Sequence, residues 1–283
     1  MERMRSLLPR SQTHAAQSLL DQYATGNQAL AARIAQCGED QILAEARRLA
    51  PLASDLLLSV KPLIGEGITG LAIQDHLLAQ YQALGWRPML VGYKGYPAAV
   101  PVSVNRRVIN CIPDEKPVPA AALVTVELVA ATAQGYVAQA WTFATADANV
   151  PQQHLLASAR HALQQGIEQV RDGVPVGAIG EAIGQVLEAC EVSPVVEFCG
   201  YTMGKHRVQA PQILGYRAAG QDTPLQAGQV LNVYVVAKAG ERGVRVLSDA
   251  WTVLSKDGQD SVVLSAMVEV TADGYQLLTP LLR

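Results

Sequence analysis

Apolar residues recur at helical spacing in four stretches of this chain, and two shorter stretches alternate in the manner of strands. Leu43, Ala46 and Leu49 share one face of a helix predicted for residues 40–60, and a similar pattern predicts helices at 71–84, 152–171 and 178–189. Residues 124–130 and 231–237 show the two-residue alternation of a strand. The chain therefore mixes helices and strands, which predicts an α+β fold.

The order of these elements repeats. A Gly-containing turn at residues 65–67 separates the first two helices, and a Gly/Pro turn at 172–175 separates the second two. The strand at 231–237 follows the one at 124–130 by about 110 residues, and Ala-Trp-Thr occurs downstream of both, at 140–142 and 250–252. Two copies of helix, helix, strand and strand predict an internal pseudo-twofold axis. We expect a sheet shared by both halves, helices outside it and a ligand cleft at the junction.

Residues 1–38 lie outside this repeat and are rich in Gln and Ala. Their apolar positions, Leu19, Leu20, Leu30 and Ile34 among them, predict one or two short amphipathic helices. Packing on the body of the protein is the favoured role for this N-terminal helical extension. Covering the cleft, binding a protein partner and self-association are the alternatives that the sequence leaves open.

Composition excludes several classes of partner. Of the 283 residues, 49% are hydrophobic and 17% charged, and the net charge is -3, so we expect no general attraction to nucleic acid or to an anionic membrane. No apolar run has the ~18–20 residues of a membrane helix, and residues 1–5 do not resemble a secretory signal. The four scattered cysteines form no CxxC motif, which is typical of reduced thiols. A cytoplasmic location is expected.

Several local motifs occur in order along the second and larger part of the chain. GYKGYP at residues 92–97 resembles GYHGYP, EFCGYTMG at 197–204 resembles EYCGHGIG, and DAWTV at 249–253 resembles DGWTV. On these motifs the chain resembles the methionine aminopeptidase and creatinase superfamily. The resemblance implies a pita-bread fold for residues 39–283, with two pseudo-symmetric halves at about 39–150 and 151–283 around a curved antiparallel sheet. Residues 1–38 lie outside it.

The resemblance also identifies what this chain lacks. The family's aminopeptidases hold a pair of divalent metals with two Asp, one His and two Glu. In this sequence those positions are Glu127, Gln139, Tyr201, Tyr234 and Ser265. One carboxylate cannot balance two dications in a partly buried cleft, and a phenol is rarely a ligand near neutral pH. We therefore expect no metal, no other cofactor and no metal-dependent peptide hydrolysis. The creatinase pattern of His and Glu is missing too.

If the motifs are in register, a group of polar and aromatic side chains faces the cleft. Glu127 is the candidate general base, Tyr201 and Tyr234 are candidate donors to an oxyanion, and Lys94 is a candidate for holding a substrate carboxylate or phosphate or forming a Schiff base. The candidate substrate-binding residues are Gln139, Trp141, Ser265, Lys205 and His206, the last two next to Arg207 in a basic cluster. Cys199 is a less favoured nucleophile.

Two functions remain open at this stage. In the favoured one, the cleft performs metal-independent acid–base chemistry on a small molecule, such as isomerisation, elimination, cyclisation or hydration, in a biosynthetic pathway. In the other, the protein is an inactive aminopeptidase homologue that binds a peptide or protein. A purely structural Glu127–Lys94 salt bridge, with both tyrosines packed above it, fits the second reading.

Overall fold

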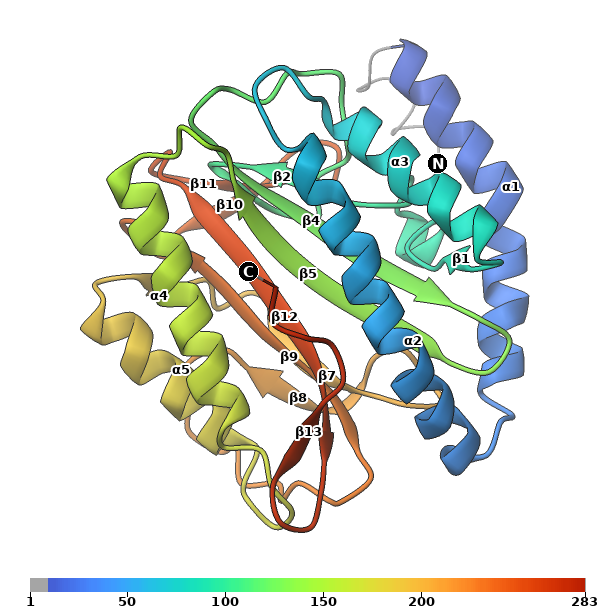
Figure 1. Cartoon of the computed structure of the whole chain (residues 1–283), viewed down its shortest axis with the longest axis vertical. Coiled ribbons are helices and arrows are strands. Elements are labelled where there is room, and N and C mark those ends of the chain that lie inside the picture. The colour runs from blue at the N-terminus through green and yellow to red at the C-terminus, as the bar shows by residue number, and fades with distance from the viewer. Residues whose placement is uncertain (1–9, 283) are drawn as a thin grey trace.

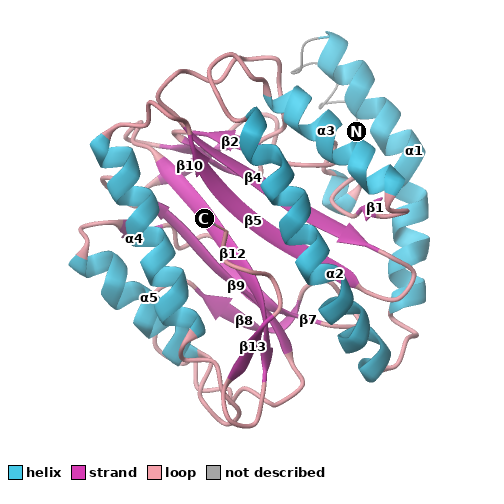
Figure 2. Cartoon of the chain, viewed as in Figure 1, coloured by secondary structure: helices cyan, strands magenta, loops and turns pink. Residues whose placement is uncertain are grey.

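The computed structural model describes residues 10–282 and shows an α+β protein in which helices cover one face of a twisted layer of strands (Figures 1 and 2). The helices are α1 (Arg10–Ile34), α2 (Glu39–Val60), α3 (Gly70–Ala83), α4 (Val150–Ile167) and α5 (Gly177–Ala189), with short 3-10 turns at Lys61–Leu63 and Tyr93–Gly95. The strands are β1 (Arg87–Pro88), β2 (Val102–Val104), β3 (Arg107–Ile109), β4 (Leu123–Ala131), β5 (Tyr136–Ala144), β6 (Ser193–Pro194), β7 (Cys199–Met203), β8 (Gln209–Leu214), β9 (Val230–Lys238), β10 (Val244–Val246), β11 (Val253–Ser255), β12 (Ser261–Val270) and β13 (Tyr275–Leu277).

The two predicted halves are present. In the first half, α2 and α3 precede the antiparallel pair β4–β5, and in the second half α4 and α5 precede β9, which pairs with β12. The expected strand at residues 250–252 is wrong: Ala250 has a φ of 66°, outside strand geometry, and β12 is the counterpart of β5. The small strand β11 pairs with β3 of the first half on one side and with β10 on the other.

Side chains join the two halves where β5 runs beside β12. The hydroxyl of Thr142 donates to Val263 O and accepts from Val263 N, at 3.0 and 2.9 Å. Ala140 N donates to Ser265 Oγ at 2.9 Å. Backbone hydrogen bonds join β4 to β5 and β9 to β12. The contacts between β5 and β12 instead use side-chain hydroxyls, one from each strand. The shared curved sheet is therefore two antiparallel sheets connected by polar side chains.

Local sequence explains where the helices of each half begin. The Thr69 hydroxyl accepts from Ala72 N at the start of α3. Asn149 and Gln152 form a reciprocal capping box at the start of α4, which satisfies two backbone donors that a helix end leaves free. Apolar faces of α2 and α4 pack on the strands, and most side chains of β4, β5, β9 and β12 are buried.

The N-terminal extension contains one long helix in its described part, where one or two short ones were expected. No proline interrupts the segment between Arg10 and Ile34. Helix α1 lies beside β1 and the segment after it (Figure 1). The buried Asn27 amide donates to the backbone carbonyls of Pro88 and Val91 at 2.8 and 3.0 Å. This helix therefore holds the segment that leads into the GYKGYP motif.

Close backbone contact completes that packing. Gly92 has a φ of 82°, and a Cβ placed on it would lie 2.6 Å from the Cβ of Ala24 in α1. Only glycine fits both the conformation and the space. No helix within residues 10–282 has the length and apolar character needed to cross a membrane. The cytoplasmic location and the domain limits stay predictions.

Candidate functional site

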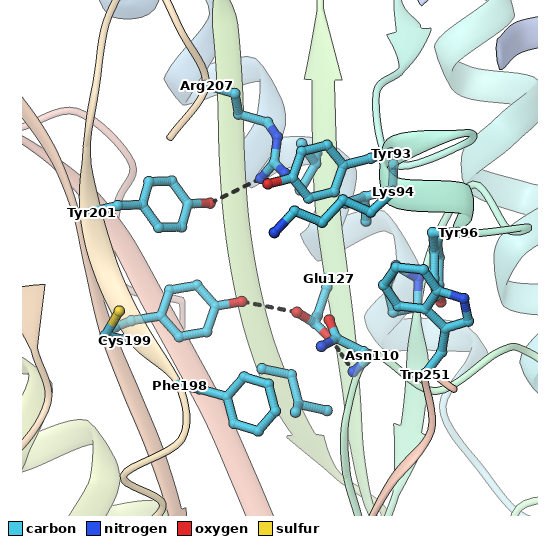
Figure 3. A pocket seen from close by; sticks show the side chains of 15 residues that line it. Tyr93, Lys94, Tyr96, Asn110, Glu127, Phe198, Cys199, Tyr201, Arg207 and Trp251 are labelled. Carbon is cyan, nitrogen blue, oxygen red and sulfur yellow. Dashed lines mark hydrogen bonds between the residues drawn. The ribbon is translucent and has the colours of Figure 1, made fainter. Parts of the chain in front are cut away.

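A cavity of about 270 Å³ opens at the junction of the two halves. Its walls come from β4, β7, β9, the GYKGYP turn and the loop before β11 (Figure 3). Aromatic side chains dominate the lining, and Glu127 is its one carboxylate. The lining residues are Leu90, Tyr93, Lys94, Tyr96, Pro101, Ile109, Asn110, Glu127, Val129, Phe198, Cys199, Tyr201, Arg207, Tyr234 and Trp251.

Glu127 lies in the middle of β4 and is 6% exposed. Its Oε1 accepts from Asn110 N at 3.0 Å and its Oε2 from the Tyr234 hydroxyl at 2.9 Å. Burial raises the pKa of this carboxyl above the usual value for glutamate, although both hydrogen bonds and the charge of Arg207 act in the opposite direction. A proton is therefore held more tightly here than on an exposed glutamate, which suits acid–base chemistry.

The two tyrosines come from neighbouring strands. Burial, followed by the charge of Glu127, raises the pKa of Tyr234 well above its usual value, so its phenol stays protonated and donates. The Tyr201 oxygen accepts from Asn232 Nδ2 at 3.2 Å and from an Arg207 nitrogen at 3.5 Å. Because both contacts are donors to the phenol oxygen, the Tyr201 proton is left to donate to a ligand.

Aromatic contacts fix the far wall. Tyr96 and Trp251 meet edge to face, with ring centroids 5.1 Å apart, and the Tyr96 hydroxyl donates to Cys111 O at 3.1 Å. Phe198 and Cys199 line the side next to β7. Burial raises the pKa of the Cys199 thiol, so its thiolate, the nucleophilic form, is disfavoured.

Two cations lie beside this carboxylate and its tyrosines. Lys94 occupies the turn with a φ of 49°, and its Nζ is 5.6 Å from the Tyr93 ring centroid. The Arg207 guanidinium is 4.3 Å from the same centroid. The structural Lys94–Glu127 salt bridge that the sequence allows is not formed. Among the described residues Lys94 has no carboxylate within ion-pair distance, and Glu127 accepts from Tyr234 and Asn110.

Four predicted site residues, Glu127, Lys94, Tyr201 and Tyr234, thus share one pocket, but Gln139 and Trp141 do not. In the β4–β5 pair Glu127 lies opposite Ala140, and side chains alternate between the faces of a sheet. Gln139 therefore faces α2, where it accepts from the Ser54 hydroxyl at 2.8 Å and donates to Pro280 O at 3.0 Å.

Trp141 shares the helix face with Gln139. The Trp141 side chain is buried in the core, and the Arg160 guanidinium of α4 lies 5.7 Å from the centroid of its ring. The prediction that Gln139 and Trp141 line the cleft is wrong, because the register of β4 and β5 places both side chains on the opposite face of the sheet from Glu127. Ser265 does lie on the face of Tyr234, its partner across β9–β12, but it is fully buried and its hydroxyl bonds Ala140 N. It connects strands and does not line the pocket.

The basic cluster after β7 contributes one residue only. Lys205 and His206 are exposed and do not line the pocket, whereas Arg207 turns back onto Tyr93 and Tyr201. The pocket also contains residues that the sequence did not identify as candidates: Tyr93, Tyr96, Asn110, Phe198 and Trp251. Most belong to the recognised motifs, so their position in those motifs was the available signal. Asn110 acts through its backbone and had none.

The family's divalent metals do not fit this donor set. Among residues 10–282 no three His, Cys, Asp or Glu side chains are grouped so that they could hold a metal ion. Glu127 is surrounded by phenols and a backbone amide, and the Gln139 oxygen is turned to the other face of the sheet. Hard and borderline dications need several anionic or imidazole donors converging on one point.

The relatives of this chain agree with its fold. Residues 42–272 match the model of metallopeptidase family M24. Methionine aminopeptidase A of Synechocystis sp. is 31% identical over 234 residues, which cover 82% of this chain and 92% of that protein. Methionine aminopeptidase of Haemophilus influenzae is 29% identical over 238 residues, covering 82% and 88%.

Solved structures show the same architecture. The crystal structure of methionine aminopeptidase from Rickettsia prowazekii has a TM-score of 0.82 at 24% identity, covering 87% of this chain and 99% of that one. Prolidase from Pyrococcus furiosus has a TM-score of 0.67 at 14% identity, covering 87% and 64%. The chain has the pita-bread fold and belongs to metallopeptidase family M24.

Proposed function

We propose that this M24 protein carries out metal-independent acid–base chemistry on a small molecule in the pocket between its two halves, and that it is not a peptidase. The observation that carries this proposal is the Glu127 carboxyl, buried in the pocket wall, hydrogen-bonded by Tyr234 and with a raised pKa. A general acid or base works best when its pKa is shifted toward the working pH, which burial does here.

The proton donors and acceptors of the pocket support isomerisation, elimination, cyclisation or hydration. Glu127 in its ionised form removes a proton from a substrate carbon or water, and in its protonated form returns one. Tyr234 holds the carboxylate in place and donates to it while ionised. The Tyr201 hydroxyl, with two donors on its oxygen, has its own proton free for an oxyanion that develops on the substrate.

The names of the relatives point toward aminopeptidase activity, and the donor set argues against it. Aminopeptidases of this family rely on metals, and the ligand positions implied by the resemblance hold one carboxylate in this chain. A pair of dications there would lack compensating charge. The small cavity of about 270 Å³, equal to roughly nine water volumes of about 30 Å³ each, supports a ligand of small size.

The first test asks for peptidase activity directly. Purified protein is incubated with Mn²⁺, Fe²⁺, Co²⁺ or Zn²⁺ and a methionyl peptide, and metal content is measured after gel filtration. We expect neither stoichiometric metal nor release of methionine. Metal-dependent release of methionine would overturn the proposal in favour of an aminopeptidase.

The second test looks for the chemistry. Wild-type protein and Glu127→Gln are incubated with a small-molecule extract of the source cells, and the products are compared by mass spectrometry. We expect one compound to be consumed by wild type only, with a product of equal mass or one differing by a water. Gln keeps the shape of Glu127 and one of its two hydrogen-bond acceptors, the amide oxygen, but cannot take up a proton. Equal turnover by both proteins would therefore contradict the proposed role.

The alternative is a binding protein without catalysis. The aromatic lining, in which Tyr93, Tyr96, Phe198 and Trp251 stand together, favours this second candidate because such walls bind apolar side chains of a peptide. Tight binding of a peptide or protein, unchanged by Glu127→Gln and without turnover, would support it. A protein partner or self-association through residues 1–38 also stays a proposal.

A further inference from the structure

Two cations share one side of the pocket and neither is paired with a carboxylate. Arg207 and Lys94 both lie against the Tyr93 ring, with their charged groups 4.3 and 5.6 Å from its centroid. Among the described residues, the ion pairs involve other side chains. Figure 3 shows the Lys94 side chain extending into the pocket beside the guanidinium of Arg207.

The Glu127 carboxylate lines the same pocket but is not the anionic partner of Arg207 or Lys94. Both Glu127 oxygens already have donors, Asn110 N and the Tyr234 hydroxyl. Arg207 has five N–H donors, and its one hydrogen bond within residues 10–282 is the 3.5 Å contact with the Tyr201 hydroxyl. Two like charges on one aromatic ring repel each other, and an anion between them would relieve that repulsion. Arg207 lines the cavity, and its guanidinium therefore has N–H donors that have no partner among the described residues.

We propose that Arg207 and Lys94 bind the anionic head of a small organic acid, a carboxylate or phosphate, whose body lies in the pocket beside Glu127. The chemistry that follows binding rests on the proposed function, whose substrate class would be small organic acids. A planar guanidinium binds such a head through paired hydrogen bonds, while the ammonium adds a point charge. The head would be fixed at Tyr93 and Tyr201, which leaves the rest of the molecule toward Glu127 and Tyr234.

The test measures binding and turnover separately. The probes are 3-phenylpropionate, phenyl phosphate and the uncharged 3-phenylpropionamide, titrated into the full-length protein by isothermal calorimetry at low salt. We expect one or both acids to bind and the amide to bind at least about tenfold more weakly, since a charge-assisted hydrogen bond contributes a factor of about ten or more. The tighter acid identifies the preferred head group.

Variants locate the site. Arg207→Gln is expected to weaken the acids about tenfold to a hundredfold and to leave the amide unchanged. Arg207→Lys keeps the charge but loses the planar pair of donors, so its affinity for the acids should lie between those of wild type and Arg207→Gln. Lys205→Gln is the matched control, because it removes one positive charge from the same loop outside the pocket. Melting curves confirm that each variant is folded.

The outcomes separate this inference from the proposed function. Equal affinity for acid and amide, no binding of any probe, or an equal effect of Lys205→Gln and Arg207→Gln overturns the anion site. Acid-selective binding supports it even when the extract experiment finds no Glu127-dependent product, in which case the proposed chemistry fails alone. A Glu127-dependent product with no acid selectivity leaves the chemistry standing and overturns the anion site.

Discussion

The hydrogen bond from Tyr234 to Glu127 is the contact whose removal should change the pocket most sharply. The phenol donates to Oε2 at 2.9 Å, and Asn110 N donates to Oε1 at 3.0 Å. Burial raises the pKa of Glu127, and these two donors partly offset that rise by stabilising the ionised form. Tyr234→Phe keeps the ring and removes one donor, so the pKa of Glu127 should rise further.

The size of the effect follows from the charge of the acceptor. A hydrogen bond to an ionised group contributes about 1.5–3 kcal/mol, and one to a neutral group about 0.5–1.5 kcal/mol. The folded-state pKa of Glu127 lies above that of the unfolded chain. Between these two values the folded protein holds one more proton, so the free energy of unfolding falls as pH rises, by about 1.4 kcal/mol per pH unit. This contribution is complete below the unfolded pKa and is lost as pH rises through the folded pKa.

Tyr234→Phe should therefore cost about 0.5–1.5 kcal/mol at low pH, where Glu127 is neutral, and about 1.5–3 kcal/mol once Glu127 is ionised. The measurement is urea unfolding over a pH series that begins below the ordinary glutamate pKa and continues past neutrality. Glu127→Gln, which cannot titrate, is the reference, and its difference from wild type isolates this one carboxyl. Parallel curves for wild type and Glu127→Gln would show that the pKa of Glu127 is not raised. A decline that ends at the same pH in Tyr234→Phe and wild type would refute the role of the phenol.

Three further sites, all outside the pocket lining, are tested by urea unfolding. Asn27→Ala should cost about 1–3 kcal/mol because it removes the side-chain donor to Val91 O and one of the two donors to Pro88 O, which still accepts from Val91 N. The exposed Gln28→Ala on the same helix should cost almost nothing. Thr142→Val should cost about 1–3 kcal/mol and Thr142→Ser much less, since only the second keeps the hydroxyl that bonds Val263. Burial alone would raise the pKa of Asp257, but hydrogen bonds, that of Lys238 first, lower it, so its contribution to stability should be lost as pH falls. Asp257→Asn should remove that pH dependence and cost about 1.5–3 kcal/mol, because it removes the charged partner of Lys238, whose ammonium keeps the carbonyls of Ala239 and Glu241.

Sequence periodicity predicted the regular elements well because burial imposes it. The helix expected at residues 40–60 is α2, Glu39–Val60, and the strand expected at 231–237 is β9, Val230–Lys238. Each apolar face packs on another element, so the period in the sequence reflects a real face. The motifs likewise placed Lys94 and Tyr201 at one pocket, since each lies in a motif, and Glu127 lies in the strand predicted at residues 124–130.

Register across a hairpin was beyond the reach of the sequence. Gln139 aligns with a ligand position, yet the turn after β4, where Thr132 N donates to Gly135 O, sets a pairing that places Ala140 opposite Glu127. One residue of difference in such a turn moves a side chain to the other face. The position of Arg207 was equally hidden, because a long side chain on a loop is directed by its contacts with Tyr93 and Tyr201 rather than by any period.

Several of the substituted positions form contacts between the two halves. In the aminopeptidases that this chain resembles, metal ligands come from both halves, so the metal ions would connect the halves. In this chain Tyr234 of β9 donates to Glu127 of β4, and Ser265 of β12 accepts from Ala140 of β5. Both contacts cross the junction, and the Thr142–Val263 pair adds two more hydrogen bonds. Direct hydrogen bonds thus join the halves where ligands would otherwise converge, and the space left between Glu127, Tyr201 and Arg207 is open to a ligand.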